Sequence, residues 1–264
     1  MASPRCGLII NPDRCPDEPM AKPELAKTKV FARVVSALKS AAGYFRDRQA
    51  DDATLRELCP LLDTAHELRW IAKSLDAGED SIVLGAKVTE PAIRHAKLDR
   101  YRVLHFATNG LLAGEMAEFA KGKAEPALVF TPPSVASDED DGLLTASEIT
   151  ELKLDADWVV MSACNTAAGD AKGAEALSGL AKAFFYAGAR ALLVSHWPVN
   201  SYAATMLTST TFSELKRDPK LNRAEAFRRS MVSLMRDKDR PWAAHPSVWA
   251  PFVVVGEGGI AMAR

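Results

Sequence analysis

The sequence predicts an α/β fold in which a mostly parallel sheet carries helices on both faces. Short, largely apolar runs recur along the chain, as expected of strands that are buried on both sides. Segments with apolar residues at helical spacing alternate with these runs. This alternation is typical of sheets built from βαβ units, which bring the carboxyl ends of their strands to one edge.

Residues 1–55 differ from the rest of the chain. Prolines recur between Pro4 and Pro23, although residues 7–10 have the composition of a short strand and residues 27–42 that of a helix. We therefore predict an N-terminal extension over residues 1–55, partly irregular or helical, and one domain over residues 56–264. The strand-like runs of that domain are residues 81–85, 102–107, 127–131, 158–163, 191–195 and 252–255.

Two helices of the domain have recognisable starts. Thr64 and Glu67 have the spacing of a capping box, in which a hydroxyl and a carboxylate satisfy the first free amides of a helix. Thr145 and Glu148 have the same spacing. Gly188 predicts the end of the helix that follows residue 177, because glycine is favoured just past a helix.

Cys164 stands at the carboxyl end of the run 158–163 and is followed by a short polar segment. Asn109 and Gly110 follow the run 102–107 in the same way. If both runs are parallel strands of one sheet, their ends share the edge at which α/β proteins bind ligands. A reactive thiol fits this position, and a buried cysteine that packs as a small hydrophobe fits the spacing equally well.

The composition argues against several classes of protein. A net charge of -1 and a pI near 6.5 are not those of a nucleic-acid binder, which needs an excess of basic residues. The four cysteines show no paired or metal-ligand spacing, so we expect free thiols, no metal and no cofactor. No apolar run approaches the ~18 to 20 residues of a membrane span, and no signal peptide is visible. We therefore expect a cytoplasmic protein without membrane contact.

Several blocks of the sequence resemble the CHAT domain, a caspase-like family of bacterial cysteine peptidases related to separases. The blocks are residues 105–110 (HFATNG), 162–166 (SACNT), 180–190 (LAKAFFYAGAR), 195–199 (SHWPV) and 245–252 (HPSVWAPF). The resemblance implies a caspase-like three-layer α/β fold over residues 56–264. It also implies an endopeptidase activity toward a protein substrate.

The resemblance assigns roles to particular residues. Cys164 is the implied nucleophile, and the backbone amides of Gly110 and Cys164 are the implied donors to the oxyanion. Glu175 is implied to help shape the substrate cleft, although a favourable interaction with a helix N-terminus accounts for it adequately. CHAT domains commonly follow helical TPR repeats, which are not visible in this sequence. Besides a polypeptide substrate, the implied partners are therefore TPR-containing or regulatory proteins.

One position departs from the family pattern. The histidine that precedes the glycine in the family is Asn109 here. A carboxamide does not titrate near neutral pH, so it cannot accept the proton of a thiol or protonate a leaving amine. Loss of general acid–base catalysis typically costs ~10² to 10⁴ in rate. We therefore predict an inactive or strongly impaired peptidase, or alternatively a pseudoenzyme that binds a peptide or a partner domain in the old cleft.

Three histidines are candidates to replace the missing base, and of these we expect His245 to belong to a loop with Pro246 and to pack against Trp249. His105 faces the same side of the predicted sheet as Asn109 but lies ~13 Å further back at ~3.3 Å per residue. A hydrogen-bonded core histidine is therefore the favoured interpretation of His105. His196 ends the next strand-like run after Cys164, so we expect it near the same sheet edge and regard it as the better candidate.

Overall fold

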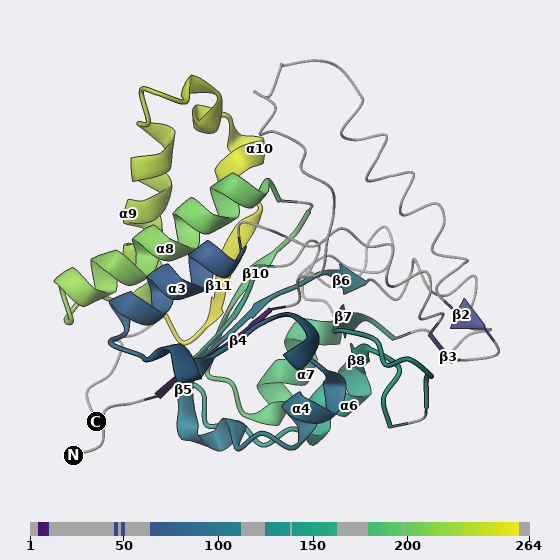
Figure 1. Ribbon diagram of the computed structural model, residues 1–264. Helices are drawn as coiled ribbons and strands as arrows, with labels where there is room; N and C mark the ends of the chain where they lie inside the picture. Colours follow the sequence, from purple (N-terminus) through teal and green to yellow (C-terminus); the bar gives the residue numbers. More distant parts are fainter. Residues whose placement is uncertain are drawn as a thin grey trace.

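The computed structural model describes residues 64–111, 125–137, 139–162, 179–197 and 199–258, and the backbone of residues 5–10, 45–46 and 49–50. Within this part of the chain, the largest sheet has six strands in the order β11-β10-β9-β5-β1-β4 (Figure 1). The strands are β1 (Arg5–Ile10), β4 (Ile82–Val83), β5 (Tyr101–Ala107), β9 (Trp158–Met161), β10 (Ala191–Ser195) and β11 (Phe252–Gly256). All neighbouring pairs are parallel except β10 with β11.

Helices cover both faces of this sheet, which confirms the predicted fold class (Figure 1). One face carries α4 (Glu90–Arg94), α6 (Ala146–Glu151) and α7 (Gly179–Ala187), and the other carries α3 (Thr64–Ser74), α8 (Ser201–Arg217) and α9 (Arg223–Met235). Alternate residues of β5 belong to the two cores. Leu104 and Phe106 lie in the core with α7, whereas Val103 and Ala107 lie in the core with α3 and α8.

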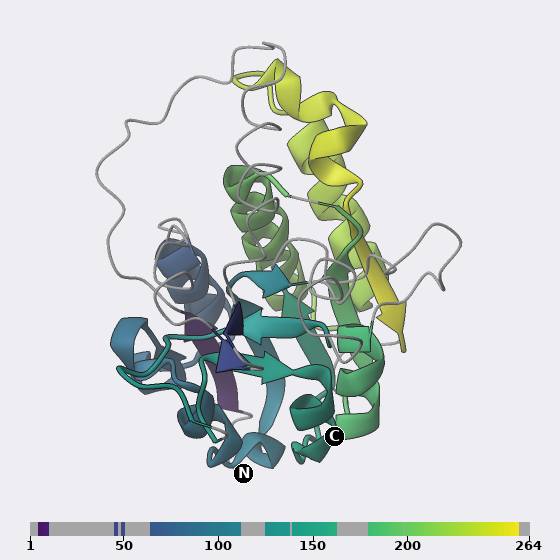
Figure 2. The same cartoon turned by 90° about the vertical axis from the view of Figure 1, so that its right-hand side faces the viewer.

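A second sheet extends from the end of β5. It contains β6 (Gly110–Leu111), β7 (Ala127–Val129) and β8 (Leu143–Thr145), which are antiparallel and face the viewer in Figure 2. The run 127–131 is therefore a strand, as predicted, but it is shorter than expected and belongs to this small sheet. The remaining elements are the hairpin β2 (Phe45–Arg46) and β3 (Gln49–Ala50), the 3-10 helices η2 (Glu79–Ser81), η3 (Gly85–Lys87), η4 (Leu98–Arg100) and η5 (Pro241–Ala244), and α10 (Pro246–Trp249).

The two predicted capping boxes have different outcomes. At α6 the box is complete, because the Thr145 hydroxyl accepts from the Glu148 amide and the Glu148 carboxylate accepts from the Thr145 amide. At α3 the prediction is wrong for Glu67. Its side chain is fully buried, and Oε1 accepts a hydrogen bond from the Thr208 hydroxyl of α8 at 2.7 Å. Glu67 is thus a core residue that joins two helices.

Candidate active site

Asn109 lies where β5 leaves the main sheet and enters the small one. The Thr108 hydroxyl donates to the backbone oxygen of Val129, and the Val129 amide donates to the backbone oxygen of Asn109 at 2.9 Å. One residue of β7 therefore holds the side chain of Thr108 and the backbone of Asn109. Thr108 is buried, whereas Asn109 and Gly110 are partly exposed, so this turn presents position 109 at the surface of the sheet edge.

The strand that precedes Cys164 lies directly beside β5. Val103 pairs with Trp158 and Phe106 with Met161 in parallel register. Beyond β9, the Ser162 amide still donates to the backbone oxygen of Phe106, at 3.1 Å. Both runs are therefore parallel strands of one sheet, as expected, and they are direct neighbours in it. Cys164 and Glu175 themselves lie outside the described residues, so their assigned roles stay predictions.

His105 is a fully buried residue of β5. Its Nε2 lies 2.9 Å from the Ser162 hydroxyl oxygen and 3.1 Å from Glu67 Oε1. These contacts agree with the interpretation of a hydrogen-bonded core histidine. Serine, histidine and glutamate also suggest a hydrolase triad, but a triad needs its carboxylate on one imidazole nitrogen and its hydroxyl on the other. Here Nε2 makes both contacts and no described residue bonds to Nδ1, so these three side chains do not have the arrangement of a triad.

His196 follows β10, on the other side of β9 from β5. Its amide donates to the backbone oxygen of Pro251 at 2.9 Å, which continues the pairing of β10 with β11. Because β5, β9 and β10 are parallel, His196 and Asn109 stand at the same edge of the sheet and flank the end of β9, as predicted. His245, in contrast, is the N-cap of α10, where its Nδ1 accepts from the Ser247 amide.

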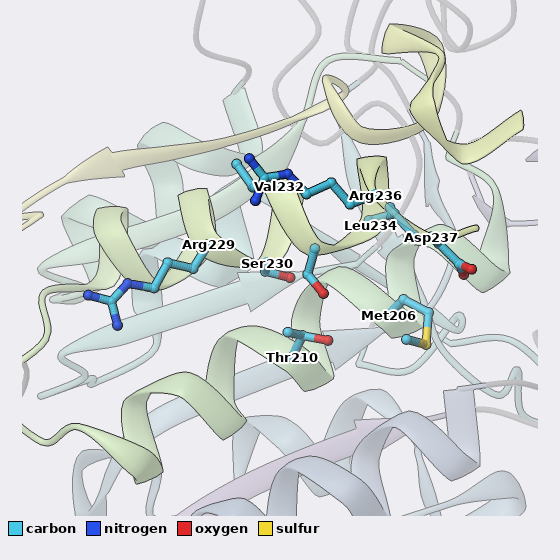
Figure 3. Close-up of a pocket in the computed structure, with 9 residues that line it drawn as sticks. Met206, Thr210, Arg229, Ser230, Val232, Leu234, Arg236 and Asp237 are labelled. Carbon is cyan, nitrogen blue, oxygen red and sulfur yellow. The ribbon is translucent and has the colours of Figure 1, made fainter. Parts of the chain in front are cut away.

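A cavity of about 560 Å³ lies between α8 and α9, outside the edge that carries Asn109 (Figure 3). None of its lining residues comes from β5, β9 or β10. Thr210 of α8 and Ser230 of α9 lie on opposite sides of it in Figure 3, with Arg229 and Asp237 at its ends. Both charges are already neutralised, since Asp237 pairs with Arg240 and Arg229 with Glu225 and Glu214. This cavity therefore lacks free charged groups at those two positions.

The described part of the chain contains neither a metal cluster nor a membrane-spanning helix. No group of three or more His, Cys, Asp or Glu side chains there is arranged to hold a metal ion. Among the same residues, no helix combines the length and the apolar character needed to cross a bilayer.

Comparison with known proteins decides the family. The model of the CHAT domain matches residues 21–257 of this chain. The chain belongs to the CHAT domain family. This confirms the membership that the sequence blocks indicated, and the match includes the segments of both Asn109 and Cys164. The CHAT match also begins before residue 56, the predicted start of the domain.

Two curated relatives share part of this CHAT domain. This chain is 33% identical to Tetratricopeptide repeat protein 28 of Mus musculus, over 43% of this chain and 4% of that protein. It is 25% identical to the Homo sapiens protein of the same name over 75% of this chain and 9% of that protein. The chain thus spans less than a tenth of these relatives' length.

A solved structure, the complex of Porphyromonas gingivalis RgpB pro- and mature domains, is similar with a TM-score of 0.46 and 11% identity. The similarity covers 74% of this chain and 42% of that chain. A likeness of this degree carries no inference about activity.

Sequence reasoning located the edge of the site but missed one buried partner. The positions of Asn109, Gly110 and His196 at the ends of parallel strands followed from the strand pattern. The contact between Glu67 and His105 was not predicted from the sequence. One signal for it was available: Glu67 falls beside Leu68 and Ile71 on the apolar stripe of α3, which is the face that packs on the sheet.

Proposed function

We propose that this CHAT domain has the scaffold of a cysteine endopeptidase and lacks its catalytic base. In this proposal Cys164 is the nucleophile, and the amides of Gly110 and Cys164 hold the oxyanion. Position 109 is where an imidazole would take the thiol proton and return it to the leaving amine. With Asn109 there, cleavage of a polypeptide is absent or strongly slowed.

The observation that best supports this proposal is the register of β5 and β9. Every paired residue of β9 lies 55 positions after its partner on β5. Asn109 and Cys164 are separated by the same 55 positions in the sequence. Continuing the register for three more residues would put these two positions side by side at the carboxyl edge, within reach of a side chain at 109.

Neither candidate histidine replaces the base well in this arrangement. His105 is fully buried, so it cannot meet a substrate. By strand alternation, His196 is on the same face of the sheet as Leu192 and Val194, which lie in the core with α7. Asn109 is on the opposite face, with Val103 and Ala107. His196 is therefore the second residue to mutate rather than the first.

A binding module is the alternative function, and Asn109 itself favours it. A carboxamide keeps both a donor and an acceptor for hydrogen bonds but transfers no proton, so a cleft that contains it can hold a peptide without cutting it. Because the curated relatives are named for tetratricopeptide repeats, the proposed partners include TPR-containing or regulatory proteins as well as a polypeptide ligand.

The variant Asn109→His separates the two functions. If the scaffold is a peptidase, this variant should cleave a peptide library, and Asn109→His/Cys164→Ala should not. The matched control is Asn222→His, which makes the same change at the exposed N-cap of α9 and should give no cleavage. A thiol-directed peptide probe provides a second readout, because it should label Cys164 faster in Asn109→His than in the unchanged chain. No cleavage and no faster labelling would favour the binding module.

A further inference from the structure

A buried polar pair lies beneath the proposed site. Glu67 of α3 and His105 of β5 are both fully buried, with Oε1 of one 3.1 Å from Nε2 of the other; we refer to them as the Glu67–His105 pair. Glu67 Oε1 also accepts from the Thr208 hydroxyl, and His105 Nε2 contacts the Ser162 hydroxyl at 2.9 Å. The pair therefore connects α3 and α8 with the chain that leaves β9.

The surroundings decide which nitrogen of a neutral His105 carries the hydrogen. Nδ1 is buried and has no hydrogen-bond partner among the described residues, so a hydrogen there would be an unsatisfied donor. It would also leave the Nε2 lone pair facing the carboxylate of Glu67 at 3.1 Å. A hydrogen on Nε2 avoids both problems, because it points at Ser162 and lies beside the carboxylate. His105 therefore donates to the Ser162 hydroxyl oxygen.

Such a pair is not what core stability alone would favour. Three neighbours on this face of the sheet, Val103, Val160 and Leu193, are apolar. Apolar replacement of a whole buried pair of ionisable side chains is often neutral or stabilising, because such groups lose their hydration on burial. In addition, Oε2 of Glu67 and Nδ1 of His105 have no hydrogen-bond partner in the part of the chain that the structure describes. A positional role for the pair explains its presence better than a gain in stability.

Ser162, just beyond β9, is anchored to β5 by two hydrogen bonds. Its amide donates to the backbone oxygen of Phe106, and its hydroxyl is held by His105. Both anchors come from β5, the strand that leads to Asn109. Ser162 stands two residues before Cys164 in the sequence.

We propose that Glu67 and His105 are positioning residues that hold Ser162, and with it the end of β9, against the strand that carries position 109. Glu67 fixes the imidazole, and the imidazole fixes the serine hydroxyl. This inference rests on the proposed function insofar as the segment being positioned leads to the nucleophile. Errors of about 1 Å in the placement of reacting groups can cost ~10²-fold in rate, so the pair would act on turnover rather than on binding.

The test removes the pair without leaving a lone buried charge. Glu67→Leu/His105→Leu replaces both groups with apolar side chains, and Ser162→Ala removes only the hydroxyl that is held. The matched control is Ser230→Ala, which removes a buried hydroxyl that bonds to the Leu207 backbone at 2.7 Å. Each change is made in the Asn109→His background, and kcat, KM and the thermal midpoint are measured.

We expect kcat to fall roughly 10- to 100-fold in the double variant and in Ser162→Ala, while KM stays within about twofold. The thermal midpoint of the double variant should not drop, and Ser230→Ala should keep its kcat. A double variant that folds and keeps full kcat would overturn the proposal. If the double variant does not fold, Ser162→Ala alone decides, because the pair remains in place there.

A second readout needs no activity and uses the chain with Asn109. Hydrogen exchange of the Ser162 amide reports how firmly the end of β9 is held. We expect this exchange to be at least about tenfold faster in Glu67→Leu/His105→Leu than in Ser230→Ala. If Asn109→His is inactive, the proposed function fails while this measurement still judges the positioning role. Unchanged exchange at Ser162 would contradict the positioning role whatever the activity.

Discussion

The most perturbed carboxyl group among the described residues gives a quantitative prediction. Glu90 is the first residue of α4 and is 1% exposed. Burial raises its pKa from 4.5 to about 8, and the negative charge of Glu148 adds to this effect. Its ionised form has two partners, the Arg94 guanidinium at 3.2 Å and the Asp141 amide at 3.3 Å, but they do not offset the loss of water.

The raised pKa makes stability depend on pH. Between pH 4.5 and about 8 the folded chain keeps a proton on Glu90 that the unfolded chain has released. The free energy of unfolding therefore falls as the pH rises through this window. At ~1.36 kcal/mol per pKa unit, the loss is about 3 kcal/mol at pH 7 and reaches at most about 5 kcal/mol above pH 8. Below pH 4.5 Glu90 is protonated in both the folded and the unfolded chain, so this loss of stability disappears.

Glu90→Gln removes the titrating group and keeps an oxygen for the Asp141 amide. Urea unfolding at pH 5, 6, 7 and 8 should show the variant close to the original at pH 5 and more stable by several kcal/mol at pH 8. Arg94→Met should act in the opposite direction, since it removes the cation that lowers the pKa of Glu90. If the original chain and Glu90→Gln lose stability in parallel from pH 5 to pH 8, the account of Glu90 is wrong.

Two further predictions concern the scaffold. Phe184→Ala should lower the free energy of unfolding by about 3 to 5 kcal/mol in urea titrations, because this ring is fully buried and its centroid lies 5.2 Å from that of the tilted Phe106 ring. Tyr186→Ala, at a residue 83% exposed, should change it little. Gly188→Ala should cost about 2 kcal/mol or more, because φ is +113° and a Cβ would lie 2.3 Å from a backbone oxygen. Gly258→Ala, where the nearest atom is 3.7 Å away, is its control, and equal thermal midpoints for the two glycine variants would contradict this reasoning.

The parts of the fold that the sequence predicted are those encoded locally. All four residues of β9 are buried, so the apolar composition of this segment was sufficient to predict the strand. The box of Thr145 and Glu148 spans four residues and needs no tertiary partner. The run 127–131 was recognised as a strand, but its pairing with β6 and β8 depends on how the chain turns after β5, which its composition does not encode.

The candidate site was predictable to a similar extent. Strand order along the chain was sufficient to expect Asn109 and His196 at one edge. The contacts of Glu67 were not predictable, because its carboxylate could bond the nearby start of its own helix or a hydroxyl 141 residues away. Only the packing of α3 on α8 decides between these partners, and it also brings Glu67 to His105.

The central claim is that this CHAT domain has the scaffold of a cysteine peptidase but lacks the catalytic base, because Asn109 occupies the position of the histidine. The most direct test is the ratio of kcat/KM for peptide cleavage by Asn109→His to that of the unchanged chain, with Cys164→Ala as the blank in each background. We predict a ratio of at least ~100, with cleavage by the unchanged chain near its blank. Cleavage by the unchanged chain that depends on Cys164 and matches that of Asn109→His would contradict the claim, because another group would then serve as the base.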